Sequence, residues 1–170
     1  MELKYYLETY KPSVLNIGCG RICPPEHYGI DLEEFAGVDQ VCDVTKGLPF
    51  KTTGDEGIFD IVITKDILEH IPAGEHGVRF LEEVYRVLKP GGKLYLEVPS
   101  TDGGGIGAFG HPYHISFWNK TKLKYFLDDK YTNGWRSSVG IKCWFEPEVL
   151  ETVYNDYDMP YVRALLKKKD

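Results

Sequence analysis

The sequence contains no apolar run close to the roughly 20 residues that a membrane-spanning helix needs. Residues 1–13, MELKYYLETYKPS, lack the cationic and then apolar order of a secretory signal peptide. Lys167–Lys169 is the only cationic run, and we interpret it as a solvated chain end. The net charge of −6 repels phosphate backbones at long range. These absences predict a soluble cytoplasmic protein with no membrane partner and no broad nucleic-acid binding.

Cysteine is scarce, and its spacing is uninformative. The four cysteines, Cys19, Cys23, Cys42 and Cys143, form no CxxC pair. Nothing in the chain suggests secretion, so free thiols are expected rather than disulfides. Cys19, Cys23 and His27 have donor atoms that metals bind, but no second ligand pair completes the set. We therefore interpret these residues as packing and assign no metal.

Length and hydrophobic pattern predict one α/β domain that spans residues 1–170. An oligomer is compatible with this sequence. Residues 59–64, FDIVIT, are typical of a strand buried on both faces of a parallel sheet. Residues 78–88 have the spacing of an amphipathic helix, which 89–92, KPGG, should end. Further strands are predicted at 13–17, 28–32, 40–43 and 93–98. This alternation favours a doubly wound, mostly parallel sheet.

The last third of the chain is predicted to close the sheet. Residues 103–110, GGGIGAFG, hold five glycines in eight positions, which indicates a mobile lid. Asn119 is expected to cap a helix over 119–127. Residues 139–145 and 161–166 are predicted to form an antiparallel pair of strands. Trp135 and Trp144 are read as packing, with a partner interface as the alternative.

Glycine and acidic residues follow four predicted strands. Gly18-Cys19-Gly20 ends the first strand, and Asp31, Asp43 and Asp66 end the next three. In open α/β sheets, ligands bind outside these carboxyl ends. Only thirteen residues separate Gly18 from Asp31, and the intervening Pro24-Pro25 cannot lie inside a helix. The pattern therefore predicts a nucleotide site that lacks the usual helix after its glycine turn.

Five segments resemble, in the same order, the class I S-adenosylmethionine-dependent methyltransferases, and in particular a compact type 11-like subset with a truncated first crossover. They are VLNIGCG, GIDL, CDVTKGLPF, FDIVITKDILEHI and FLEEVYRVLKPGGKLYLEVP. The resemblance implies a Rossmann-like fold, S-adenosylmethionine as cofactor and methyl transfer as the reaction. This cofactor has no pyrophosphate, so a missing first helix is tolerable.

The resemblance also implies the residues that hold the cofactor. Asn16, Gly18, Cys19 and Gly20 would surround its methionyl part. Asp31 would accept hydrogen bonds from both ribose hydroxyls, for which an ionised carboxylate is well suited.

Further cofactor contacts are implied at the following strand ends. Leu32 would flank the adenine, Asp43 would bind its amino group, and the Val44 amide would meet a ring nitrogen. Lys65 would offer its carbonyl to the cofactor amine, with its side chain in solvent. Arg21 is the candidate that replaces the missing helix dipole beside the cofactor carboxylate, and a surface role is its alternative.

Candidate catalytic residues lie in two segments. His70, in a LEH motif that many small-molecule methyltransferases share, and Asp66 would face the acceptor, and His111 and His114 follow the predicted lid. A structural role is the alternative for each histidine. Methyl transfer depends mainly on alignment, and a base is needed only when the acceptor loses a proton.

We therefore expect methyl transfer to a small-molecule or sugar-type acceptor. One alternative is a non-catalytic, cofactor-binding partner subunit with the same fold. Another is a nicotinamide-dependent oxidoreductase, which is disfavoured because the GCGRIC turn lacks the third glycine and the helix that hold a pyrophosphate.

Overall fold

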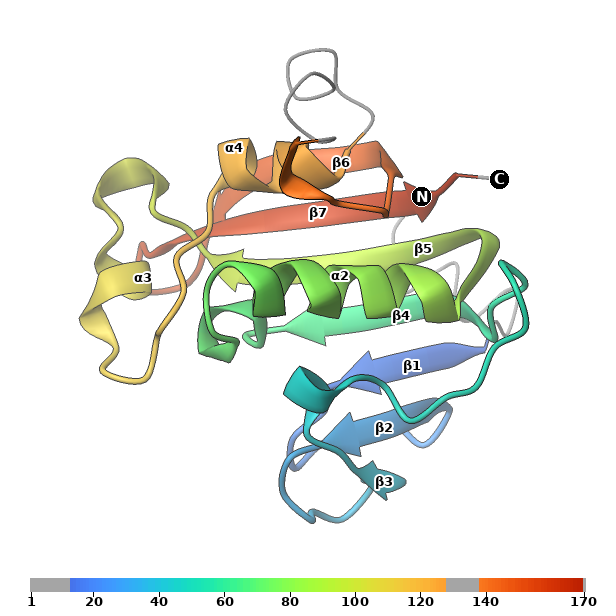
Figure 1. Ribbon diagram of the computed structural model, residues 1–170. Coiled ribbons are helices and arrows are strands. Elements are labelled where there is room, and N and C mark those ends of the chain that lie inside the picture. The colour runs from blue at the N-terminus through green and yellow to red at the C-terminus, as the bar shows by residue number, and fades with distance from the viewer. Residues whose placement is uncertain (1–12, 128–137, 170) are drawn as a thin grey trace.

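The computed structural model describes residues 13–127 and 138–169. A seven-stranded sheet runs in the order β3-β2-β1-β4-β5-β7-β6 (Figure 1). Neighbouring strands among β1 to β5 pair in parallel. Strand β7 is antiparallel to both β5 and β6. The predicted doubly wound sheet with a closing antiparallel pair is confirmed. The strands are β1 (Val14–Ile17), β2 (His27–Asp31), β3 (Gln40–Val41), β4 (Phe59–Lys65), β5 (Leu88–Pro99), β6 (Phe145–Tyr154) and β7 (Pro160–Lys168).

Helix α2 (Glu75–Val87) covers one face of the sheet beside β4 and β5 (Figure 1). Phe80, Leu81 and Val84 form its apolar stripe, and all three are buried. The helix ends where the sequence predicts, but no separate turn follows it. Strand β5 begins at once with Leu88, and a register shift opposite β4 absorbs residues 89–92.

The connection from β1 to β2 contains no helix, as Pro24-Pro25 predicts. Instead, the backbone amides of Gly18 and Cys19 donate to the Ile30 carbonyl at 2.8 and 3.2 Å. Gly18 has a φ of +68°, a conformation that glycine adopts without steric cost. The glycine turn is therefore held directly against the end of β2.

The glycine-rich stretch, which the sequence predicts to be a mobile lid, forms two short helices. These are η3 (Asp102–Gly104) and α3 (Ile106–Gly110), separated by Gly105 at a φ of +64°. The predicted helix at 119–127 is present as α4 (Lys120–Leu123) followed by η4 (Lys124–Phe126). Asn119 caps it as expected, because its side-chain oxygen accepts from the Lys122 amide at 2.8 Å.

The prediction for the closing strands is right for β7 and wrong for β6. Of residues 139–145, only Phe145 lies in a strand. Strand β6 contains Pro147 beside a register shift, which an edge strand tolerates. Trp144 is 48% exposed, and Trp135 lies outside the described residues. Lys168 is buried and donates to the Leu88 carbonyl at 2.8 Å, so the cationic run is not a solvated end.

No helix within the described ranges has both the length and the apolar character that a membrane crossing requires.

Candidate functional site

A pocket of about 450 Å³ lies at the carboxyl ends of the parallel strands. Glycine, acidic and apolar residues at the ends of β1, β2, β3 and β4 line it. The sequence-predicted residues in its lining are Gly18, Asp31, Leu32, Asp43, Val44 and His70, and Ile67 and Ile71 add apolar surface. The topology thus brings together residues that lie far apart in the sequence.

Asp31 is fixed by the backbone of the glycine turn. One carboxylate oxygen accepts from the Gly20 amide at 2.8 Å, and the other accepts from the Glu33 amide at 3.2 Å. An ionised carboxylate has about four lone-pair sites. Each Asp31 oxygen therefore keeps capacity for one further donor in the pocket.

Gly18 lies beneath the side chain of Ile67. A methyl group added at Gly18 would lie 1.9 Å from the Ile67 Cδ1 atom. A side chain at this position would have to displace Ile67, and the φ of +68° disfavours any residue other than glycine.

The far wall of the pocket is the short helix η1 (Val44–Lys46). Asp43 caps it, because its carboxylate accepts from the Thr45 amide at 3.1 Å and from the Thr45 hydroxyl at 2.6 Å. These bonds and the ion pair with Lys46 at 3.1 Å hold the pKa of the Asp43 carboxyl below its usual value. The cap orients η1, and Asp43 and Val44 both line the pocket.

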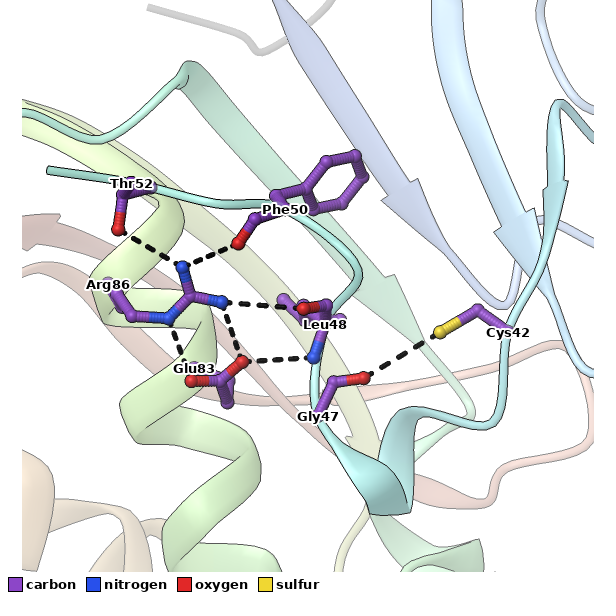
Figure 2. A network of polar contacts seen from close by, with 7 residues as sticks. All are labelled: Cys42, Gly47, Leu48, Phe50, Thr52, Glu83 and Arg86. Atoms are coloured by element: carbon purple, nitrogen blue, oxygen red, sulfur yellow. Dashed lines mark hydrogen bonds and ion pairs between the residues drawn. The ribbon is translucent and has the colours of Figure 1, made fainter.

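A network centred on Glu83 and Arg86 of α2 supports this wall from behind (Figure 2). Arg86 donates to the Phe50 carbonyl at 2.8 Å and pairs with Glu83 at 2.7 Å. Glu83 in turn accepts from the Leu48 amide at 2.9 Å. This pairing holds the pKa of Glu83 below its usual value. Sequence reasoning missed the network, although the i,i+3 spacing of Glu83 and Arg86 was a signal.

A second hollow of about 740 Å³ adjoins the pocket and shares Gly18 and Ile67 with it. Asn16, Cys19 and Asp66 line this hollow. Burial, reinforced by Cys23, raises the pKa of the Cys19 thiol to about 12.

Two residues predicted to bind the cofactor have side chains at the surface. The Lys65 side chain is 52% exposed, as expected, and its ammonium lies 2.6 Å from a Glu97 carboxylate oxygen. Arg21 is exposed and stacks over the Phe35 ring at 4.8 Å. Phe35 lines the pocket, so Arg21 touches the site through this ring. A role for Arg21 toward the cofactor carboxylate stays a prediction.

Three histidines meet beside the pocket. His70 lies in η2 (Leu68–His70), and its ring centroid is 5.1 Å from that of His114 and 6.0 Å from that of His111. The rings of His111 and His114 are 4.6 Å apart. Because His70 also lines the pocket, this histidine cluster is continuous with it. The structure thus brings together His70 and the segment with His111 and His114, which the sequence analysis predicted separately as catalytic candidates.

Glu69 lies beneath the histidine cluster and is only 1% exposed. Neither of its carboxylate oxygens has a hydrogen-bond partner among the described residues. Burial, with a contribution from the Asp66 carboxylate, raises the pKa of Glu69 to about 8. Glu69 is not singled out within the LEH motif by the sequence, because the burial of its carboxylate depends on tertiary packing that the motif does not reveal.

Asp66 connects β4 to η2 in a strained conformation. Its φ of +54° lies in the left-handed region, which only a few per cent of non-glycine residues adopt. Burial and the Asp66 carboxylate raise the pKa of Tyr161 to about 12. The turn directs Asp66 toward the hollow beside Lys65, where it is exposed.

A third hollow, of about 790 Å³, lies along α2 beside Trp118 and residues 139–142. It contains none of the sequence-predicted site residues.

Comparisons with known proteins agree with this geometry. Residues 15–96 match a family described as methyltransferase domain. No curated protein sequence matches significantly. Among solved structures, the chain is similar to a methyltransferase from Archaeoglobus fulgidus that depends on S-adenosylmethionine, at 16% identity and a TM-score of 0.62 over 98% of this chain and 91% of the other.

Two further structures have the same fold. The Burkholderia thailandensis 1,6-didemethyltoxoflavin-N1-methyltransferase, with bound 1,6-didemethyltoxoflavin and S-adenosylhomocysteine, is 17% identical with a TM-score of 0.61, covering 94% of this chain and 72% of the other. The N-methyltransferase NodS from Bradyrhizobium japonicum is 13% identical with a TM-score of 0.58, covering 99% and 92%. The family match places residues 15–96 in a methyltransferase-domain family, and the chain shares the fold of S-adenosylmethionine-dependent methyltransferases.

Proposed function

We propose that this enzyme methylates a hydroxyl group of a small, sugar-type molecule held between the strand-end pocket and the histidine cluster. The observation that carries the proposal is the position of His70, which lines the pocket and also belongs to the cluster. An acceptor beside His70 would meet both the transferable methyl group and a neutral imidazole.

The residues of the pocket fit the cofactor. Asp31 has two spare acceptor positions for a ribose, and Leu32 and Ile67 offer apolar walls to an adenine ring. Asp43 and Val44 supply polar groups at the edge of the same pocket. The bound cofactor contributes an electrophilic sulfonium methyl group, and the chain contributes binding, alignment and a place for the acceptor proton.

The hydrogen bonds of the imidazoles indicate which histidine can accept that proton. Nδ1 of His114 faces the Ala108 carbonyl at 3.1 Å, and Nδ1 of His70 faces the Tyr113 carbonyl at 3.1 Å. A carbonyl only accepts, so each Nδ1 carries a hydrogen and each Nε2 keeps a lone pair. Nδ1 of His111 instead accepts from the Tyr113 amide at 3.3 Å, which leaves the proton on Nε2. His114 and His70 are therefore better proton acceptors than His111.

Exposed aromatic side chains lie on the segment that carries His111 and His114, and they support a ring-shaped acceptor. Phe109, Phe117 and Tyr113 are exposed by 60%, 42% and 75%. The rings of Phe109 and Phe117 lie 4.8 Å apart. Their apolar faces suit the C–H surface of a sugar, while the Tyr113 hydroxyl offers a polar contact.

The test is methyl transfer from isotopically labelled S-adenosylmethionine to a panel of small polyols, glycosides and amines. We expect labelled ethers from hydroxyl acceptors. Replacement of His114 by Gln should lower turnover by about 100-fold or more, with unchanged affinity for S-adenosylhomocysteine. The matched control is His76→Gln, because His76 is exposed on α2 outside the pocket.

Two outcomes would contradict the proposal. Transfer to amines alone would exclude a hydroxyl acceptor. Cofactor binding without turnover on any acceptor would favour the partner-subunit alternative. One structural neighbour, a putative methyltransferase from Haloferax volcanii, is in complex with the Trm112 methyltransferase activator, so the screen should include cell extract as a source of such a partner.

A further inference from the structure

Glu69, His70 and His114 form a compact group of metal-ligand atoms. One donor atom from each residue lies within 4.8 Å of the other two. We propose that these residues bind a divalent transition metal of the zinc class through the Glu69 carboxylate and Nε2 of the two histidines. Nitrogen and carboxylate donors suit such ions, and three protein ligands leave a position open for water or an acceptor.

The imidazoles are already oriented as metal ligands. Metal-binding histidines usually donate their other ring N–H to a carbonyl or carboxylate, which fixes the tautomer. His70 and His114 both do so through Nδ1, toward the Tyr113 and Ala108 carbonyls at 3.1 Å. Both Nε2 atoms therefore carry lone pairs, and Nε2 of His114 lies 3.9 Å from a Glu69 carboxylate oxygen.

Glu69 provides independent support. Its carboxylate is buried with both oxygens unpartnered among the described residues, and an unpaired buried carboxylate is costly. Its side chain is 2% exposed, against 9% for that of His114. Asp66 adds negative charge nearby, as its effect on Glu69 indicates. A divalent cation between Glu69 and the histidines would satisfy this carboxylate.

The backbone around the group is tied together. The Glu69 carbonyl accepts from the Ile115 and Ser116 amides at 2.8 and 3.0 Å. The Ser116 hydroxyl donates to the Leu68 carbonyl at 2.6 Å. The segment that carries His114 is thereby fixed against η2, which carries the other two ligands.

The three ligand atoms, which lie within 4.8 Å of one another, must draw closer together to bind the ion. Ligands at about 2.0–2.1 Å from a tetrahedral zinc lie about 3.4 Å apart. The observed 3.9 Å between Glu69 and His114 exceeds this by about half an ångström, which side-chain rotation can supply. His70 is exposed and has room to move toward the other two ligands.

A bound ion would also act on the acceptor. Zinc lowers the pKa of a coordinated water to about 7, and a coordinated acceptor hydroxyl would be activated in the same way. This catalytic meaning rests on the proposed function, whereas binding of the ion does not. The ion would then replace His114 as the group that activates the hydroxyl, and the proton would pass to solvent.

The test is calorimetric titration of the metal-free protein with Zn²⁺, with Co²⁺ absorption as a report on coordination. We expect one site of micromolar or tighter affinity. Glu69→Gln and His114→Gln should each weaken Zn²⁺ binding by at least about 100-fold, since even indirect partners of a metal site contribute 10–100-fold. His76→Gln is the matched control and should bind like the wild type. Asp31→Asn should also keep Zn²⁺ while losing the cofactor, which separates this inference from the proposed function.

Imidazole ¹⁵N resonances of the wild-type protein provide a measurement that requires no variant. On addition of Zn²⁺, the Nε2 signals of His70 and His114 should shift strongly, and that of His76 should not. No saturable Zn²⁺ or Co²⁺ binding would overturn the proposal. Binding that Glu69→Gln and His114→Gln leave unchanged, or Nε2 signals that do not move, would overturn it equally.

Discussion

Replacement of Asp31 by Asn tests the cofactor site most directly. The Asp31 carboxylate lines the pocket, and its oxygens accept hydrogen bonds from the Gly20 and Glu33 amides at 2.8 and 3.2 Å, so its replacement should have two effects. The side chain therefore serves both the glycine turn and the pocket. Truncation to Ala would remove both functions together, so the nearly isosteric Asn variant is the sharper test.

The magnitude follows from the hydrogen bonds that Asn cannot reproduce. Its NH₂ group must face either a backbone N–H of the turn or a ribose hydroxyl, so one acceptor position is lost and the charge is lost. Hydrogen bonds to charged groups contribute about 1.5–3 kcal/mol each. A net loss of about 2–4 kcal/mol corresponds to about 30-fold to 1000-fold weaker cofactor binding.

The assay is calorimetric titration with S-adenosylhomocysteine, accompanied by thermal unfolding. The matched control is Asp39→Asn, because Asp39 also accepts from a backbone amide, that of Gly29 at 2.7 Å, but does not line the pocket. We expect a similar, small loss of stability in both variants and a loss of affinity only in Asp31→Asn. An affinity within about threefold of wild type would refute the assignment of Asp31 to the ribose, and so would an equal loss in Asp39→Asn.

Three further predictions concern the support of the site. Gly18→Ala should lower the free energy of unfolding by about 2–5 kcal/mol in urea unfolding, because it combines left-handed strain with collision against Ile67. Adding Ile67→Ala should recover only part of this loss. A single variant as stable as the wild type would contradict the close approach. Arg86→Met should lower the free energy of unfolding by about 2–4 kcal/mol in the same assay, whereas Arg79→Met, at an exposed ion pair, should lower it by under about 0.5 kcal/mol. Equal losses would contradict a stabilising role for the Glu83–Arg86 network. Because folding lowers the pKa of Glu83, its contribution is complete above the unfolded pKa of about 4.3 and disappears as pH falls through the folded pKa. Urea midpoints between pH 6 and 3 should therefore fall less in Arg86→Met than in wild type, and parallel curves would contradict this linkage.

The strands and the polar residues at their ends could be predicted from the sequence because their signals are local. Consecutive apolar residues in 59–64 indicate a buried strand wherever they occur, and Pro24-Pro25 excludes a helix whatever lies around it. Glycine and acidic residues at strand ends then meet at one edge of the sheet. Six of the seven strands, and the pocket residues at the ends of the parallel ones, follow from such signals.

Residues whose roles depend on distant partners could not be predicted. Strand β6 is an exposed edge strand with glutamates and Pro147, so its pattern resembles a loop until β7 pairs with it. Lys168 is predicted to be solvated, because the Leu88 carbonyl that accepts its hydrogen bond lies 80 positions away in the sequence.

The sequence by itself determined the parallel sheet, the helix-free glycine turn and the identity of the residues at the strand ends, since each depends on periodicity or on backbone restrictions of a few neighbouring residues. Only the tertiary structure decided that His70, His111 and His114 form one cluster above a buried Glu69. The physical reason is that burial and the meeting of side chains from separate loops are set by long-range packing, on which the desolvation of a carboxylate and the orientation of an imidazole depend.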